Sequence, residues 1–572
     1  MAKTIYTQCC ICRRVNLGTW IKLNEEDTEK LKSNIAIGFC PECQKTNKIR
    51  KKKLKNNKKV IYTVLIGDYE NELHEAPDLE DWDCIAFVSD MSIKDRGWTL
   101  KELEISKPLG VVRTSRLPRI LPHLFLDDKY EESIYIDASV ILESDPSTWK
   151  TDKGNLRDHD CIWGVAKHWE RQCVWQEFIA NDLAEKTHPD TLREQEAHYK
   201  KLGLEDARVL LNQNSVIYRK HKDPRVIEAC ADWWKYFCQH TCRDQLSFPM
   251  AVAETGIKRS YIQPDPTHGT SNPNWKIIHS GKHKTIYKRW PLYFLISNTR
   301  GSAISRGLQV GKCLFDRGVR NKVFIPSYGM EPVRNSVIII VKEMRRELRQ
   351  LKEQGNKLIF DIVDNSKVWE NGLTSNIRFL DGCIFPNERL VNEWQEKGYE
   401  FPERWAVIEH HWDYRFEPNA AEDFSPVCIC THTQIPDVVH ELGVDCITEG
   451  NGWDGLFKDA LNYNLHIGVY RDDMDYMHKP ATKLITAAGC MCNVILQRTP
   501  SNMALLPDHY PYYVDSEKEI PEMLEKCRRD YYEDGQETWM KALQMIEEVQ
   551  VLTCGGAIAA EYEEFLREKF GV

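Results

Sequence analysis

SIYIDASVIL, residues 133–142, is an apolar run that one carboxylate and one small polar residue interrupt. The run has the length and composition of a buried strand, and Asp137 stands where that strand would end. Two similar runs, VIYTVLIGDYE and DCIAFVSD, end near Gly67 and at Asp90. Such strands are typical of a parallel sheet whose carboxyl edge carries ligand-binding loops. We therefore expect an α/β fold with Asp137 at that edge.

Two interpretations of Asp137 are open. A nucleotide sugar breaks at its anomeric carbon and leaves a diphosphate, whose negative charge a divalent cation held by Asp137 would neutralise. Alternatively, the Asp137 side chain caps the turn that follows the strand.

The chain as a whole has the size of a multidomain protein. Its 572 residues are 42% hydrophobic and contain no apolar stretch of membrane-spanning length. The opening MAKTIYTQCC lacks the pattern of a secretion signal, so we expect a cytoplasmic protein whose 20 cysteines stay reduced. The net charge of -9 gives no general attraction to nucleic acid or to an anionic membrane. Positive charge is concentrated in KIRKKKLKNNKK, residues 48–59.

Two CxxC pairs precede this basic run. Cys9 and Cys12 form the first pair, and Cys40 and Cys43 form the second. Four thiolates at this spacing suit one tetrahedral, structural zinc ion, although four unrelated core cysteines are the alternative. The stretches CCICRRVNLGTW and GFCPEC also resemble zinc ribbons appended to bacterial signalling proteins. We expect a zinc ribbon over residues 1–47, followed by the basic run as a linker.

Six motifs follow in order: YTVLIGDYE, FVSD, LPRILPHLFL, VAKHWERQCVWQEF, LNQNSVIYRKH and CRDQLSFPMA. Together they resemble a glycosyltransferase-like family that was first recorded as a plant domain of unknown function and is linked to cell-wall mucilage. The resemblance covers about residues 60–280. It implies a nucleotide-diphospho-sugar transferase (GT-A) fold over residues 60–282, with a linker over residues 283–290.

The same resemblance suggests site residues. Asp137 would belong to a motif that binds the donor and Mn²⁺ or Mg²⁺, with Asp244 and Glu177 as further catalytic carboxylates. Ser139 departs from the acidic DxD pattern, because a hydroxyl holds such cations less firmly than a second carboxylate. The other candidates for donor or acceptor binding in this half are Gly67, Asp90, His123, Ser139, His168 and Arg171.

Several of these residues have simpler explanations. His123 can hydrogen-bond a carbonyl group in a turn, and Glu177 can be a solvated helix residue. DPRVIEACADWWKYFCQH predicts a helix capped by Asp223, with Pro224 in its first turn. Its predicted core face consists of Val226, Cys230, Trp233 and Phe237. Asp244 follows in a predicted polar loop, where a carboxylate is costly unless it is paired or exposed.

Residues 291–572 show two further sets of alternating strands and helices, which predict two lobes, about 291–420 and 421–572, with a cleft between them. In HKPATKLITAAGCMCNVI, Pro480 suits the first turn of a helix. The helix amides, with Lys479 and Lys483, would bind a diphosphate without a metal.

This stretch resembles the donor-binding segment of GT-B glycosyltransferases. RGSAISRGLQVGKCLFDRG resembles the first glycine-rich loop and helix of the same fold, which suggests donor contacts at Gly301, Arg306 and Gly307. Ser501 and Asn502 stand where the family usually has a glutamate. The alternative is a doubly wound scaffold that binds nothing, with the lysines on a solvated face and the glycines serving close packing. His410 and His411 follow a strand and are weaker candidates, since adjacent side chains point in different directions.

We interpret the chain as a glycosyltransferase with two modules that add sugars from nucleotide-diphospho-sugar donors to one acceptor, which is a glycan, a protein or a DNA base. One alternative is transfer to hydroxymethylated bases of viral DNA, because the basic run can bind phosphates. Another is a non-catalytic interaction protein built on degenerate transferase folds. A glycoside hydrolase also uses paired carboxylates, but it has no need of phosphate-directed lysines.

Overall fold

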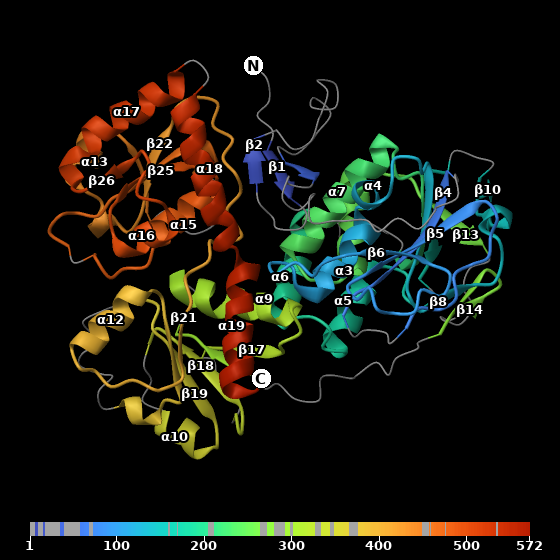
Figure 1. Cartoon of the computed structure of the whole chain (residues 1–572), viewed down its shortest axis with the longest axis horizontal. Coiled ribbons are helices and arrows are strands. Elements are labelled where there is room, and N and C mark those ends of the chain that lie inside the picture. Colours follow the sequence, from blue (N-terminus) through green and yellow to red (C-terminus); the bar gives the residue numbers. More distant parts are fainter. Residues whose placement is uncertain are drawn as a thin grey trace. The chain divides into compact units, whose positions relative to one another are not determined.

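The computed structural model describes residues 6–9, 15–17, 35–38, 58–67, 72–157, 161–168, 170–203, 211–263, 271–278, 292–297, 301–325, 333–343, 348–364, 376–448, 457, 459–474, 476–533 and 536–572. The chain forms two compact units (Figure 1). One unit comprises residues 37–288, and the other comprises residues 1–36 with 289–572.

A nine-stranded sheet forms the centre of the unit 37–288. Its order is β10-β9-β13-β11-β12-β7-β4-β5-β6. In chain order its strands are β4 (Lys59–Leu65), β5 (Trp82–Val88), β6 (Thr99–Glu102), β7 (Glu132–Ile136), β9 (Lys150–Thr151), β10 (Gly154–Asn155), β11 (Trp163–Lys167), β12 (Asn212–Arg219) and β13 (Ser260–Gln263). A second sheet has the order β14-β15-β8, with β8 (Val140–Leu142), β14 (Ser271–Asn272) and β15 (Trp275–Ile277).

The large sheet is mixed, whereas the sequence predicted a parallel one. β7, β4, β5 and β6 pair in parallel. β12 runs antiparallel to both β7 and β11. Apolar content shows that a strand is buried on both faces, but it does not give the strand's direction, which explains the difference.

The helices of this unit are α3 (Gly110–Ile120), α4 (Pro122–Phe125), α5 (Val174–Leu183), α6 (Pro189–Lys201), α7 (Pro224–Gln239) and α8 (Asp244–Thr255). The prediction for α7 is confirmed, since the Asp223 side chain accepts a hydrogen bond from the Arg225 N–H and Pro224 begins the helix. The four predicted core side chains of α7 are fully buried. Asp244 does not lie in a loop as expected, because it is the first residue of α8.

The first lobe of the other unit contains a six-stranded parallel sheet with the order β17-β16-β18-β19-β20-β21. Its strands are β16 (Leu292–Leu295), β17 (Asn321–Phe324), β18 (Val337–Val341), β19 (Lys357–Asp361), β20 (Gly382–Phe385) and β21 (Trp405–Val407). The π-helix η3 (Ala303–Gln309) and helices α9 (Val310–Asp316), α10 (Leu348–Glu353) and α12 (Glu388–Glu396) connect them.

The second lobe contains a five-stranded parallel sheet with the order β23-β22-β24-β25-β26. Its strands are β22 (Pro426–Ile429), β23 (Asp445–Ile447), β24 (Leu465–Gly468), β25 (Asn493–Gln497) and β26 (Tyr513–Val514). Its helices are α13 (Asp437–Glu441), α15 (Thr482–Gly489), α16 (Pro500–Leu505), α17 (Ile520–Tyr532) and α18 (Glu537–Leu552).

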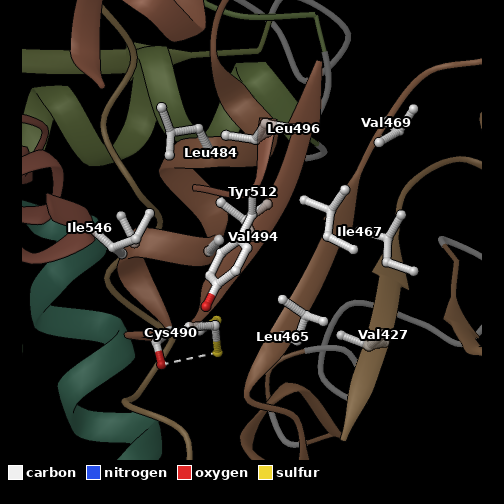
Figure 2. Close-up of a cluster of buried hydrophobic side chains, with 14 of the residues drawn as sticks. Val427, Leu465, Ile467, Val469, Leu484, Cys490, Val494, Leu496, Tyr512 and Ile546 are labelled. Atoms are coloured by element: carbon white, nitrogen blue, oxygen red, sulfur yellow. Dashed lines mark hydrogen bonds between the residues drawn. The ribbon is translucent and has the colours of Figure 1, made fainter. Parts of the chain in front are cut away.

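The core of the second lobe lies between its sheet and its helices. Figure 2 shows side chains of β22, β24 and β25 beside Leu484 of α15 and Ile546 of α18. The last helix, α19 (Gly555–Phe570), packs instead in the core of the first lobe. Figure 1 shows α19 beside α9 and β17. The end of the chain therefore ties the two lobes of this unit together. An α/β fold rich in parallel strands, as predicted, is confirmed.

Two further predictions concern a zinc ribbon near the N-terminus and the lack of a membrane-spanning segment. The backbone of the N-terminal segment forms β1 (Tyr6–Cys9), β2 (Val15–Leu17) and β3 (Ile35–Gly38). Cys12, Cys40, Cys43 and the side chain of Cys9 lie outside the described residues, so the zinc ribbon stays a prediction. Among the helices that the structure describes, none is both long and apolar enough to cross a membrane.

His221, just after β12, generates a prediction about pH. Its side chain is buried, and within the described part of the chain neither ring nitrogen has a hydrogen-bond partner. Burial, with the nearby charges of Arg219, His123 and Lys222, lowers the pKa of His221 to about 3.

We expect the unit 37–288 to lose stability as the pH falls below about 6.5. In this pH range His221 binds a proton in the unfolded chain, whereas the buried ring stays neutral in the folded chain. Above that pH the contribution of His221 is constant. Thermal unfolding measured between about pH 8 and pH 5 should show a shallower dependence in His221→Leu than in the natural chain. Replacement of the exposed His509 by Asn is the control, and equal slopes in all three proteins would refute the prediction.

Candidate functional site

Asp137 and Asp244, two predicted site residues that are far apart in the sequence, meet at Arg119. The Arg119 guanidinium of α3 lies 2.7 Å from Asp244 Oδ2 and 3.3 Å from Asp137 Oδ1. Arg119 and Asp244 are buried, whereas the Asp137 side chain is 34% exposed. Burial opposes the charge on Arg119, but the two carboxylates outweigh it and raise the pKa of the guanidinium. Asp137 is therefore the member of this cluster that a ligand can reach.

The position of Asp137 is defined by its neighbours. Its N–H donates to the Ser215 carbonyl of β12, and its carbonyl accepts the Val140 N–H, which closes the turn between β7 and β8. The Tyr135 hydroxyl donates to Asp137 Oδ1 at 2.6 Å. The backbone thus closes the turn, while the carboxylate is oriented by Tyr135 and Arg119. This arrangement does not match the turn-cap interpretation of the side chain.

Asp244 is held from several sides. Besides Arg119, Asn214 of β12 donates to Asp244 Oδ2 at 3.3 Å, and Arg116 Nε lies 4.0 Å from Asp244 Oδ1. Burial raises the pKa of Asp244, but the charges of Arg119 and Arg116 outweigh this effect. The pKa of the carboxyl group is therefore below its ordinary value. Asp244 is therefore a buried anion that fixes Arg119.

The same geometry bears on the expected Mn²⁺ or Mg²⁺. A divalent cation would bind through the negative charge of Asp137 and Asp244, but Arg119 already compensates that charge. In the described ranges, no group of three or more His, Cys, Asp or Glu side chains is arranged to hold a metal ion. The carboxylates as arranged do not fit a divalent cation, and the positive charge beside Asp137 is a guanidinium.

His168, Arg171 and Glu177 form a second cluster in this unit. The Arg171 guanidinium donates to Glu177, and it lies 2.9 Å from His168 Nε2. Glu177 is 2% exposed and also accepts a hydrogen bond from Asn181. It is therefore not a solvated helix residue. Burial and the charge of Arg171 lower the pKa of His168 to about 4.

The other predicted site residues of this unit take part in local packing or in turns. Gly67 has φ +66°, and a Cβ atom there would lie 2.9 Å from Val111 of α3. Asp90 is exposed and accepts hydrogen bonds from the N–H and hydroxyl groups of Ser92, as a turn cap does. Ser139 is buried, and its carbonyl accepts the N–H of Ile278. Burial, with the charge of Arg219, lowers the pKa of His123 to about 4.

A cavity of about 400 Å³ lies between the two lobes of the other unit. The first lobe lines it with the start of the η3 segment and with the residues that follow β18, β19 and β21. The second lobe contributes the residues after β22, β23 and β24 and the first turns of α15. The carboxyl ends of both parallel sheets therefore meet at one cavity, as ligand sites of such sheets do.

Lys479 and Lys483, both predicted, line this cavity. Their ammonium groups lie 5.0 Å and 4.0 Å from the centre of the Tyr470 ring, and Lys483 Nζ also donates to the Val469 carbonyl. Both the N–H and the carbonyl of Tyr470 are bonded to the side-chain amide of Gln497. Tyr470 was not predicted, although it stands two residues after β24 in LHIGVY.

Two neighbouring positions explain how the lysines are placed. Helix α15 begins at Thr482, so Pro480 lies ahead of the helix and not in its first turn as expected. Ser501 donates to the Lys479 carbonyl at 2.8 Å, and Asn502 donates to the Gln497 carbonyl. Ser501 and Asn502 are both buried, so they hold the cavity wall in place.

The first lobe contributes backbone strain to the cavity. Lys342 and Val363 follow the adjacent strands β18 and β19, and both line the cavity. Their φ angles are +64° and +66°, in the left-handed region that residues with a Cβ atom avoid. Lys342 Nζ pairs with Asp364 at 3.1 Å. Strained backbone of this kind tends to cluster at functional sites. No periodicity of the sequence indicates it.

His410 and His411 both line the cavity. His410 Nε2 lies 3.0 Å from the carbonyl of the strained Val363, and His411 Nε2 lies 2.8 Å from the Ser305 carbonyl. Burial lowers the pKa of both histidines, and for His410 the nearby charge of Arg306 lowers it further. Both rings are therefore neutral groups that brace the wall.

Of the three residues predicted from the glycine-rich loop, one faces the cavity. Gly301 lines it, with φ +46°. Gly307 packs against Ile296, since a Cβ atom there would lie 2.3 Å from that side chain. Arg306 is fully buried beneath the wall, where it pairs with Asp361 at 2.9 Å. The sequence did not indicate that this arginine faces inward.

Comparison with protein families gives one match. Residues 105–262 match the family model described as TOD1/MUCI70, glycosyltransferase-like domain. The matched segment extends from just before α3 to β13 and contains Arg119, Asp137 and Asp244. A comparison with curated proteins finds no match.

Several solved structures are similar to this chain at low sequence identity. HepE of Anabaena in complex with UDP and glucose has a TM-score of 0.35 and 10% identity, over 49% of this chain and 100% of that chain. A glycosyltransferase from Rickettsia africae has a TM-score of 0.35 and 8% identity, over 50% and 99%. The GtfA/B complex has a TM-score of 0.29 and 14% identity, over 41% and 57%. This chain thus spans little more than half of the GtfA/B chain.

The strain at Lys342 generates a prediction. Lys342→Gly and Lys342→Ala both remove the ion pair with Asp364, but only glycine adopts φ +64° without a steric cost. We therefore expect the glycine variant to be more stable than the alanine variant by about 1 kcal/mol. Denaturant unfolding of the two variants checks this. The same pair of substitutions at Lys357, in β19, should show the reverse order.

Proposed function

We propose that this chain is a nucleotide-sugar-dependent glycosyltransferase with two transferase modules. The main support is that the segment matching a glycosyltransferase-like family contains the one partly exposed carboxylate of a buried charge cluster, Asp137. The second module is proposed from the cavity between two parallel sheets, which Lys479 and Lys483 line. We assign a GT-A fold to the first module and a GT-B fold to the second.

In the first module, Asp137 is the group that faces the sugar. Glycosyl transfer breaks the bond between the anomeric carbon and the diphosphate, and positive charge develops on the sugar ring. A carboxylate held in one orientation by Tyr135 and Arg119 stabilises that charge and accepts hydrogen bonds from sugar hydroxyls. Asp244 acts indirectly, because it fixes the guanidinium that orients Asp137.

In the second module, Lys479 and Lys483 face the diphosphate. Negative charge grows on the diphosphate as it leaves, and the ammonium groups that line the cavity stabilise it. The N–H groups of the first turn of α15 add partial positive charge at the same place. Tyr470 stacks under both lysines and keeps their ammonium groups at the cavity wall.

Donor and acceptor identity require experiments on the full chain. A screen of nucleotide sugars for thermal stabilisation identifies the donor, because a ligand that binds only the folded state raises its melting temperature. For the acceptor we keep glycans, proteins and hydroxymethylated DNA bases as proposals. If no nucleotide sugar raises the melting temperature, the result would favour the interpretation of the chain as a non-catalytic protein.

Lys483→Ala should weaken the binding of UDP to the full chain about tenfold or more, because one charge-assisted hydrogen bond to the diphosphate is lost. Lys483→Arg should keep most of the affinity. Isothermal titration measures both. Lys518→Ala removes an exposed ammonium group of the same lobe and is the control. Equal weakening by Lys518→Ala would mean that only overall charge matters.

Asp137→Asn should lower the rate of sugar transfer by the first module about a hundredfold or more, since the amide keeps the size and accepting oxygen of Asp137 but not its charge. Thermal unfolding should change little, because Asp244 still neutralises Arg119. Asp145→Asn, at an exposed turn, is the matched control. The double variant Asp137→Asn/Lys483→Ala also impairs the second module. If this variant still transfers sugar at the original rate, the assignment of Asp137 is wrong.

A further inference from the structure

Two cysteines at the end of β22 stand apart from the proposed chemistry. Cys428 and Cys430 belong to VCICTHT, and their Sγ atoms lie 3.7 Å apart. Cys428 is fully buried within the second lobe, whereas Cys430 is one residue past the strand and lines the cavity. One thiol of the pair is therefore reachable from the cavity, and the other lies directly behind it.

The surroundings of Cys430 favour its thiolate. The two Sγ atoms are within hydrogen-bond distance, and a bond donated by Cys428 stabilises the Cys430 thiolate. Lys483 and Lys479 add positive charge from the cavity wall. Burial works against the thiolate, but the balance lowers the pKa of Cys430 to about 7, while the pKa of Cys428 is raised. Thiolates are the species that hydroperoxides oxidise. A thiol within reach of such a thiolate is placed to resolve the product.

We propose that Cys430 is an oxidation site in the donor cavity, and that a hydroperoxide converts Cys428 and Cys430 to a disulfide that weakens donor binding. In the first step the Cys430 thiolate attacks one oxygen of hydrogen peroxide, which gives a sulfenic acid and hydroxide. In the second step the Cys428 sulfur displaces the sulfenic hydroxyl, and the thiol proton leaves with it as water. In total, two thiols and one peroxide give one disulfide and two waters.

The consequence for binding follows from the position of the bond. The two sulfur atoms must approach from 3.7 Å to about 2 Å, which moves Cys430 away from the cavity wall. Thr431 and Gln434 follow Cys430 along the chain and line the same cavity, so they shift with it. The wall that faces Lys483 then changes shape. This part of the inference rests on the proposed function, because it takes the diphosphate as the ligand.

The chemistry is tested first, without any assumption about donors. The reduced full chain is treated with hydrogen peroxide, alkylated and analysed by peptide mass spectrometry. We expect a disulfide between Cys428 and Cys430, reversed by dithiothreitol. In Cys428→Ser, which leaves Cys430 without its resolving thiol, dimedone should trap a sulfenic acid at Cys430. Cys446, a partly exposed cysteine of the same lobe, is the internal control. Oxidation of Cys430 no faster than that of Cys446 would overturn the proposal.

The regulatory part is tested by UDP titration of the reduced and oxidised chain. We expect a several-fold loss of affinity on oxidation, absent in Cys428→Ser and recovered with dithiothreitol. A disulfide that leaves UDP affinity unchanged would overturn the regulation. If the reduced chain binds no nucleotide, the proposed function fails and the regulation with it, whereas the disulfide by itself would still establish the oxidation site.

Discussion

A fully buried ion pair between Arg306 and Asp361 organises the first lobe around the cavity. The guanidinium forms three contacts with the Asp361 carboxylate and donates to the carbonyls of Ile408 and Glu409. Tyr562 of α19 donates its hydroxyl to the same carboxylate. Taking such charges out of water is costly, and the cost is offset only when the remaining donors and acceptors are satisfied, as they are here. The pair thus joins η3, β19, the segment after β21 and the last helix.

The cavity wall depends on this pair through chain neighbours. Ser305 precedes Arg306, Val363 lies two residues after Asp361, and His410 follows Glu409, and all three line the cavity. Because the buried pair restrains the backbone on each side of them, Val363 can keep its strained φ angle, with its carbonyl against His410. These residues form part of the first-lobe wall of the cavity. The second-lobe wall opposite it carries the lysines and Cys430.

The two compact units place positive charge in different ways. In the unit 37–288, two carboxylates share one buried guanidinium, which compensates their charge inside the protein and orients the partly exposed Asp137. In the cavity of the other unit, the ammonium groups of Lys479 and Lys483 lie over the Tyr470 ring, and both residues line the cavity. Guanidinium groups suit fixed, multidentate pairing, and ammonium groups are compact point charges. The first arrangement suits positioning, and the second suits binding of an anion.

Local sequence patterns predicted the α/β class, helix α7 with its cap and core face, Asp137 at a strand end, and Lys479 and Lys483 close to the beginning of a helix. These features follow from local periodicity, capping chemistry and the rule that parallel sheets bind ligands at their carboxyl edges. Three features became visible only in the folded chain: β12 runs antiparallel, Arg119 joins Asp137 to Asp244, and Arg306 faces inward. Strand direction and the partner of a buried charge depend on contacts between segments far apart in the chain, and no local pattern encodes them.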